Sequence, residues 1–326
     1  MKISVALCAY NGSCYLREQL DSIAAQTRLP DELVICDDHS CDETPKILEA
    51  FAARAPFPVR VYVNERNLGS TANFGRAIEL CTGDVIALSD QDDMWQEQKL
   101  ARFESEFRSR PGLGLIFSDA ELVDENGLPL GHRLWQHTLT RRRRRSIDAG
   151  KAFEVLARGN SVTGATMAFL SSLRQLVLPI PESSYIIHDG WIALIGSAVA
   201  ELRALDEPLI QYRQHGGQQL GIDLDARVAT IRTSAAERWR YYSGEIDRLE
   251  AARERLLSVK VSDQYQVPFL SSRLELLEKL EKHYRVRADI PRRLSRRFNL
   301  ILRELLTGRY HRFSKGVRSA VLDLVR

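Results

Sequence analysis

Short apolar runs alternate with helically spaced apolar residues over about the first 120 positions of the chain. The runs predict strands over residues 3–8, 33–36, 59–63, 85–88 and 113–117. The spacing between them predicts helices over residues 15–24, 44–53, 70–80 and 97–109. Because this alternation is typical of βαβ units, we predict an α/β fold with a mostly parallel sheet and helices on both faces.

The strand pattern largely ends near residue 225, and helical spacing follows. It predicts a helix near residues 274–283 and a second one near 298–305. The apolar face of the second is predicted to carry Phe298, Ile301, Leu302 and Leu305, with arginines interspersed. Such a basic amphipathic helix can lie in a membrane interface, and it can equally pack on the rest of the protein. We predict two parts, a domain over residues 1–222 and a helical, basic extension over 223–326.

The composition is that of an ordinary soluble globular protein, with 44% hydrophobic and 27% charged residues. The five cysteines form no CxxC pair, so we expect reduced thiols in a cytosolic protein and no zinc site. The N-terminus lacks the pattern of a signal peptide, and no apolar run approaches the length of a membrane span. We therefore expect a cytoplasmic protein without a membrane-spanning helix.

The net charge of +3 conceals an uneven distribution. Residues 285–326 contain twelve Lys or Arg against three Asp or Glu, so the rest of the chain is acidic. A basic end indicates an anionic partner, either membrane lipid or nucleic acid. Because no nucleic-acid-binding motif with interleaved aromatic residues occurs, we expect the inner face of the cell membrane and no nucleic acid. The five arginines at 141–145 are expected either in a solvated loop or in a mobile segment near the acceptor side.

Three carboxylates, Asp90, Asp92 and Asp93, follow directly on the apolar run 85–88. Acids at the point where a strand leaves the core are costly unless a cation neutralises them. Mg²⁺ and Mn²⁺ prefer one or two carboxylates together with phosphate oxygens and water. The cluster therefore predicts a divalent ion that also holds a diphosphate, although a solvated acidic loop would look the same in isolation.

Polar segments also follow the first two predicted strands, at residues 8–12 and 37–42. Ligands of such sheets lie beyond the carboxyl ends of the strands, so these segments and the acid cluster are predicted to meet at one rim. Asp42 is expected to cap the following helix. Asp37 and Asp38 precede that turn, and a carboxylate there can accept the imide N–H of a uracil or thymine ring.

Six segments, in this order and at these intervals, make the chain resemble an inverting family 2 glycosyltransferase with the GT-A fold. They are Ala9-Tyr10-Asn11, residues 37–44 (DDHSCDET), Asn67-Leu68-Gly69, residues 89–95 (SDQDDMW), residues 188–191 (HDGW) and residues 212–216 (YRQHG). The likeness covers roughly residues 2–222. It implies the GT-A nucleotide-diphospho-sugar transferase fold, followed here by a C-terminal helical extension.

The resemblance also implies roles for individual residues. Donor binding is expected of Ala9, Tyr10, Asn11, Asp38, Asn67, Gly69, Asp90 and His215. Asp92 would hold the metal, with His215 as a further metal ligand or diphosphate contact. Asp189 matches the catalytic base of the family, although its spacing alone would also make it the N-cap of a helix. His39, Ala72 and Ala9 depart from the commoner Gly, Lys, and Thr or Ser of the family.

The acceptor side is predicted from the remaining polar segments. Small polar residues at 160–166, including Thr163 and Gly164, suit sugar hydroxyls, although a plain turn into a strand would look the same. His188 is expected beside the acceptor. Trp191 is interpreted as an acceptor platform or as a packing residue of a helix.

The motifs are most similar to those of bacterial rhamnosyltransferases. That likeness implies dTDP-L-rhamnose as the donor and a saccharide or lipid-linked acceptor in cell-surface polysaccharide synthesis. A UDP-hexose or UDP-N-acetylhexosamine donor is the alternative within the family. A nucleotidyltransferase is a distant alternative, which should carry a Gly-rich, basic loop after the first strand; residues 9–13 lack one.

Overall fold

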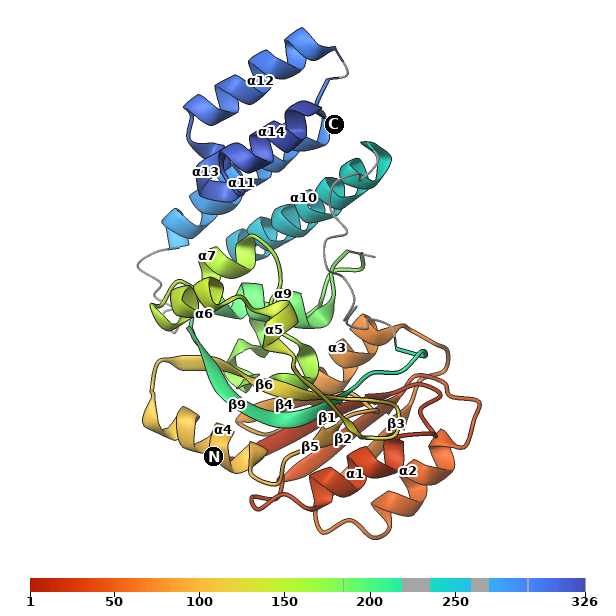
Figure 1. Ribbon diagram of the computed structural model, residues 1–326. Coiled ribbons are helices and arrows are strands. Elements are labelled where there is room, and N and C mark those ends of the chain that lie inside the picture. The colour runs from red at the N-terminus through yellow and green to blue at the C-terminus, as the bar shows by residue number, and fades with distance from the viewer. Residues whose placement is uncertain (184, 219–234, 259–269, 292, 326) are drawn as a thin grey trace. The chain divides into compact units, whose positions relative to one another are not determined.

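The computed structural model describes residues 1–183, 185–218, 235–258, 270–291 and 293–325 (Figure 1). Contacts divide the chain into two compact units. Unit 1 comprises residues 1–156, 160–182 and 187–222, and unit 2 comprises residues 157–159, 183–186 and 223–326.

Unit 1 is built on a nine-stranded mixed sheet. Its strands are β1 (Ile3–Ala9), β2 (Glu32–Asp37), β3 (Val59–Val63), β4 (Val85–Ser89), β5 (Met94–Trp95), β6 (Leu113–Val123), β7 (Pro129–Arg133), β8 (Met167–Leu170) and β9 (Glu201–Arg213). They lie in the order β3-β2-β1-β4-β8-β6-β9-β5, and β7 pairs with β6.

The N-terminal half of the sheet is parallel, as predicted. Strands β3, β2, β1 and β4 are joined by α1 (Leu16–Ala24), α2 (Thr44–Ala52) and α3 (Ser70–Leu80), and α4 (Lys99–Ser109) leads into β6. Every residue of β1, β2 and β4 is buried, which explains why these strands appear as continuous apolar runs. Cys8 and Cys36 contribute free thiols to this core. The predicted α/β fold with helices on both faces is confirmed.

Strand β8 interrupts the parallel pattern, because it pairs antiparallel with both β4 and β6. Parallel pairing is therefore confined to β3-β2-β1-β4 and to β6-β9. The reversal has a direct consequence. Ala168 of β8 pairs with Ala87 of β4, so the turn before β8, the 3₁₀ helix Gly164–Thr166, lies at the carboxyl end of β4. This brings residues near 164 to the same edge as the acid cluster.

The arginine run is helical and not a loop, contrary to the sequence prediction. It forms most of α6 (Arg141–Asp148), which Thr140 caps by accepting a hydrogen bond from the backbone N–H of Arg143 at 3.3 Å. Arg144 forms ion pairs with Asp206 at 2.6 Å and Asp148 at 3.8 Å. The remaining short helices are α5 (Trp135–Thr138), α7 (Ala152–Ala157) and α8 (Arg174–Val177), and the longer α9 is His188–Ser197.

The described part of unit 2 is helical. Its helices are α10 (Ala235–Ser258), α11 (Leu270–Ala288), α12 (Leu294–Leu306), α13 (Arg309–Phe313) and α14 (Val317–Val325). The two predicted C-terminal helices are confirmed within α11 and α12. Ile301, Tyr310 and Ala320 form a small core between α12, α13 and α14. Over the described ranges, no helix is both long enough and apolar enough to cross a membrane.

Candidate active site

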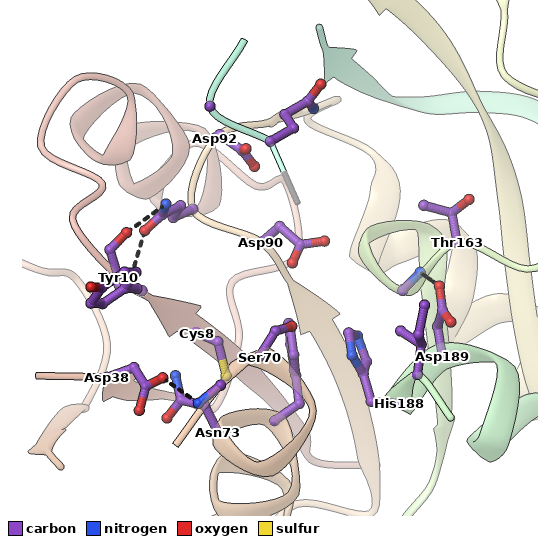
Figure 2. Close-up of a pocket in the computed structure, with 18 of the residues that line it drawn as sticks. Cys8, Tyr10, Asp38, Ser70, Asn73, Asp90, Asp92, Thr163, His188 and Asp189 are labelled. Atoms are coloured by element: carbon purple, nitrogen blue, oxygen red, sulfur yellow. Dashed lines mark hydrogen bonds between the residues drawn. The ribbon is translucent and has the colours of Figure 1, made fainter. Parts of the chain in front are cut away.

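A cavity of about 400 Å³ opens at the carboxyl edge of β1, β2 and β4 (Figure 2). Its walls come from these strand ends, the start of α3, the turn before β8, the first turn of α9 and the end of β9. Of the residues expected at a site, it brings together Ala9, Tyr10, Asp38, Asn67, Gly69, Asp90, Asp92, Thr163, Gly164, His188 and Asp189. The meeting of three strand ends at one rim is therefore confirmed.

The acid segment after β4 is held by the end of β9. Arg213, only 1% exposed, donates its Nε–H to the carbonyl oxygen of Asp92 at 2.9 Å. Its backbone N–H donates to the Asp93 carboxylate at 3.1 Å. Two residues further on, Nε2 of His215 lies 2.9 Å from Oδ2 of Asp92. His215 does not line the cavity itself and reaches it through Asp92.

The cavity wall concentrates negative charge. Removal from water raises the pKa of Asp90 to about 7, and the charges of Asp92 and Asp189 add to the increase. In Figure 2 the Asp90 carboxylate points toward the side formed by Thr163 and Asp189. Burial together with the neighbouring carboxylates also raises the pKa of Asp93. Such a cluster favours a cationic ligand.

A buried lysine beneath this cluster was not found by sequence reasoning. Lys99 is fully buried at the start of α4 and donates to the carbonyl oxygen of Ala165 at 2.6 Å. Its Nζ lies 3.6 Å from the centroid of the Trp95 ring. Burial lowers the pKa of Lys99, while Asp93 and Asp90 oppose that decrease. In sequence, a lysine in the first turn of a helix is indistinguishable from a solvated one.

The side chains of Asp92 and His215 are placed to coordinate a divalent ion from one side. These side chains face each other, and the described residues contain no cluster of three His, Cys, Asp or Glu able to hold a metal. A site with few protein ligands is nevertheless the ordinary arrangement for Mg²⁺ where substrate phosphates and water complete the coordination. The donor set is therefore suited to an ion that arrives with a diphosphate.

Asp38 lines the cavity, and its carboxylate already holds the neighbouring loop. It accepts hydrogen bonds from the backbone N–H groups of Leu68 at 2.8 Å and Gly69 at 2.9 Å, and from the Asn64 side chain at 2.6 Å. Gly69 has a φ of 83°, which favours glycine, and directly precedes α3. Asp38 thus shapes the wall that carries Asn67 and Gly69.

Asp37 and His39, the neighbours of Asp38, do not line the cavity. The Asp37 carboxylate accepts a hydrogen bond from the Ser40 hydroxyl, and burial raises the pKa of Asp37. His39 has a φ of 66°, in the left-handed region. That conformation gives a physical reason for a glycine at this position in similar sequences.

Gln91 fixes the strand end that carries Tyr10, and sequence reasoning assigned it no role. Its Oε1 accepts from the Tyr10 N–H at 2.8 Å, and its Nε2 donates to the Tyr10 carbonyl at 3.1 Å. Asn11, expected at the donor, is turned away from the cavity. Its φ is 46°, and its side-chain oxygen accepts from the backbone N–H of Cys41 at 2.9 Å.

Asp189 lies in the first turn of α9 and lines the cavity. Ile187 is the N-cap of this helix, so the alternative that Asp189 is the cap is wrong. Its carboxylate accepts from the Asn160 side chain at 3.1 Å and from the Gly164 N–H at 3.2 Å. Removal from water raises the pKa of Asp189 to about 6, because these bonds only partly offset the lost hydration.

His188 also faces the cavity, and neither ring nitrogen has a hydrogen-bond partner among the described residues. The ring stacks on Phe74 with centroids 3.9 Å apart. Burial lowers the pKa of His188 to about 3, so the imidazole is neutral. A Cβ on Gly164 would lie 2.7 Å from its Nε2, so only glycine leaves room for the ring.

Of the two interpretations of Trp191, the acceptor platform is wrong. Trp191 is 1% exposed and does not line the cavity. Its indole N–H donates to the carbonyl oxygen of Val177 at 2.8 Å. Trp191 is a packing residue of α9.

Comparisons with known proteins agree with this geometry. Residues 4–156 match the model of glycosyl transferase family 2. An uncharacterized glycosyltransferase of Nostoc sp. is 28% identical over 220 residues, 66% of this chain and 66% of its own length. The dTDP-rhamnosyl transferase RfbG of Shigella flexneri is 36% identical over 98 residues, 29% of this chain and 34% of its own.

A solved structure of S. aureus TarS residues 1–349 in complex with UDP-GlcNAc aligns with a TM-score of 0.57. It is 16% identical and covers 98% of this chain and 90% of that one, so the likeness concerns the fold. The match to the Nostoc protein spans just under two thirds of that relative. Taken together, the comparisons support a GT-A fold, in which residues 4–156 resemble glycosyl transferase family 2.

Proposed function

We propose that the protein transfers a sugar from a nucleotide diphosphate donor to an acceptor hydroxyl with inversion, and the match of residues 4–156 to the model of glycosyl transferase family 2 supports this. One observation carries the proposal: Asp92 and Asp189, far apart in sequence, line the same cavity. The first stands in a carboxylate cluster that suits a cation and diphosphate. The second is a carboxylate with a pKa of about 6, suited to accept a proton near neutral pH.

On the donor side, the residues that would hold Mg²⁺ or Mn²⁺ are Asp92 and His215. When bound, the ion would supply positive charge for the diphosphate that leaves with the nucleoside. The wall formed by Ala9, Tyr10, Asn67 and Gly69 would enclose the nucleoside. The Asp38 carboxylate already accepts hydrogen bonds from the N–H groups of Leu68 and Gly69. Asp38 would therefore contribute to binding of the nucleotide base indirectly, by fixing the backbone of Leu68 and Gly69.

On the acceptor side, Asp189 would remove the proton of the attacking hydroxyl. The side chain of Asn160 and the N–H of Gly164 orient the carboxylate, which retains lone pairs for a substrate proton. Attack on the anomeric carbon opposite the leaving diphosphate inverts that centre in a single displacement. A β-linked rhamnose donor would therefore give an α-rhamnoside.

His188 would bind a sugar hydroxyl. A buried polar group without a partner is costly, and a neutral imidazole offers one donor and one acceptor. A hydroxyl has matching capacity for both. Thr163 lines the same part of the cavity and would add a further contact.

For the donor, we favour dTDP-L-rhamnose over a UDP-hexose or UDP-N-acetylhexosamine. The support is the likeness of part of the chain to a dTDP-rhamnosyl transferase and the motif pattern of residues 89–95 and 212–216. The acceptor would be a saccharide or a lipid-linked saccharide of a cell-surface polysaccharide. Such an acceptor places the reaction at the cytoplasmic face of the membrane, in line with the basic charge of residues 285–326.

Thermal shift and donor hydrolysis, measured over a panel of nucleotide sugars with and without Mn²⁺, test the proposal. We expect a metal-dependent shift with dTDP-L-rhamnose that exceeds the shift with UDP-hexoses. A shift with UDP-sugars alone would replace the donor and retain the reaction. The absence of a metal-dependent shift with every nucleotide sugar would reject the proposed function.

A further inference from the structure

Helix α12 of unit 2 exposes an apolar stripe. Leu294, Phe298, Leu302 and Leu306 recur every four residues, and each is between 41% and 80% exposed. The predicted apolar face is divided in the structure. Ile301 and Leu305 turn inward onto Tyr310 and Ala320, whereas Phe298 and Leu302 point to solvent. The helix therefore has one apolar side that packs in unit 2 and a second that the described residues leave uncovered.

Helix α14 packs against α12 (Figure 1) and exposes a second apolar stripe. Val317, Val321 and Val325 also recur every four residues and are between 51% and 72% exposed. Isolated apolar residues are common on protein surfaces. Here, however, exposed apolar residues repeat along two helices that pack against each other. Such a pattern is typical of a surface that binds a partner.

Arginines flank both stripes. Arg303 lies three residues before Leu306 on α12, and Arg318 lies three residues before Val321 on α14, so each is a neighbour of its stripe on the helix surface. Both are exposed and form no ion pair with a described residue. By contrast, Arg287 is paired with Asp323 at 2.6 Å in the interior of the unit. The free cations thus lie beside the exposed apolar residues, and the paired one stabilises the fold.

We infer that the exposed sides of α12 and α14 bind the surface of a membrane that contains anionic lipid. Apolar side chains of an interfacial helix enter the boundary between headgroups and acyl chains, and flanking arginines contact lipid phosphates. The combination of apolar stripe and unpaired arginine is complementary to this partner. Duplex nucleic acid would interact with the arginines and leave the apolar residues exposed. A second copy of the chain would bring arginines against arginines, and these would repel one another.

Vesicle co-sedimentation of the full chain tests the inference, without donor or acceptor so that catalysis plays no part. The vesicles are phosphatidylcholine alone and an equal mixture of phosphatidylcholine and phosphatidylglycerol. We expect binding to the mixture that weakens with salt, and weak or no binding to phosphatidylcholine. Equal binding to both vesicles, or to neither, would overturn the inference and would leave the proposed function untouched.

Two paired variants separate the exposed sides of α12 and α14 from general charge and hydrophobicity. Phe298→Ser with Leu302→Ser should reduce binding at least about tenfold. Its control, Val63→Ser with Leu128→Ser, removes two exposed apolar residues of unit 1 and should bind like the wild type.

The second pair of variants makes the same change in net charge on two different surfaces, one in unit 2 and one on α6. Arg303→Glu with Arg318→Glu should reduce binding at least about tenfold, whereas Arg141→Glu with Arg142→Glu in α6 should have little effect. Equal losses in the two arginine variants would overturn the inference. Light scattering completes the test: a dimer that the Phe298→Ser, Leu302→Ser variant dissociates would assign the surface to a second copy. Duplex DNA that displaces the vesicles through the same arginines would assign it to nucleic acid.

Discussion

Nε2 of His215 lies 2.9 Å from Oδ2 of Asp92, although the two residues are 123 positions apart in the chain. Two strand pairings produce this contact. Strand β9 pairs with β5, so Gln211 lies opposite Met94, directly after the acid segment. Arg213 then binds the backbone of Asp92 and the carboxylate of Asp93. The end of β9 therefore determines the geometry of the acid cluster.

The first prediction concerns metal binding at this contact. His215→Ala should weaken Mn²⁺ binding, measured calorimetrically with a nucleoside diphosphate present, by at least about tenfold, since one of two protein ligands is lost. His132→Ala, at an exposed histidine of β7, is the control and should bind Mn²⁺ like the wild type. An unchanged Mn²⁺ affinity in the His215 variant would remove this residue from the metal site.

Arg213 provides the second prediction. Its side chain is buried between Asp92, Glu125 and Glu18, and lies 4.6 Å from the centroid of the Tyr15 ring. Arg213→Met leaves these acceptors unpaired, so the free energy of unfolding should fall by about 3–5 kcal/mol in urea titrations. The control Arg102→Met breaks a half-exposed pair with Glu207 and should cost less than about 1 kcal/mol. Similar losses for both variants would contradict the role of Arg213.

Much of the site follows from the sequence, because the carboxyl ends of parallel strands meet at one edge. Asp38, Asp90 and Asp92 were found in this way. The antiparallel strand β8 could not be foreseen, and it is β8 that brings Gly164 beside Asp189. Local pattern cannot show which segment a short strand will pair with.

Side-chain direction was harder to predict than location. Trp191 follows Asp189 by two positions, and residues two apart on a helix point to opposite sides. Because Asp189 faces the cavity, Trp191 must face the core. The helical arginine run α6 was missed for another reason. Its stability depends on the cap at Thr140 and on the ion pair between Arg144 and Asp206, a residue distant in sequence.

The third prediction is that Asp189→Asn abolishes transfer and retains the donor. The amide keeps the shape of the carboxylate but cannot accept the hydroxyl proton, so turnover should fall by about 10²–10⁴-fold. The donor affinity, measured by calorimetry, should be close to that of the wild type. Retention of a large fraction of turnover would exclude Asp189 as the base.

The pH dependence of kcat/KM gives the fourth prediction. The base acts only when deprotonated, and its pKa is raised from the usual carboxyl value to about 6. Activity should therefore be half-maximal near pH 6, reach its plateau well above that pH and fall tenfold per pH unit well below it. Asp90 faces the same cavity with a pKa raised to about 7, so it loses its negative charge over the same range, while neighbouring His188 stays neutral. An acidic limb near pH 4 would mean that a solvated carboxylate supplies the base.

The fifth prediction tests His188 through its contact with Gly164. Gly164→Ala inserts a Cβ 2.7 Å from Nε2 of His188 and must displace the ring. His188→Ala removes the ring and frees that space. Each single change should raise the acceptor KM with little effect on donor affinity, because the hydroxyl loses its partner. The double variant should be no worse than His188→Ala alone, since the clash no longer exists. Additive losses would show that Gly164 acts independently of His188, through its N–H to Asp189.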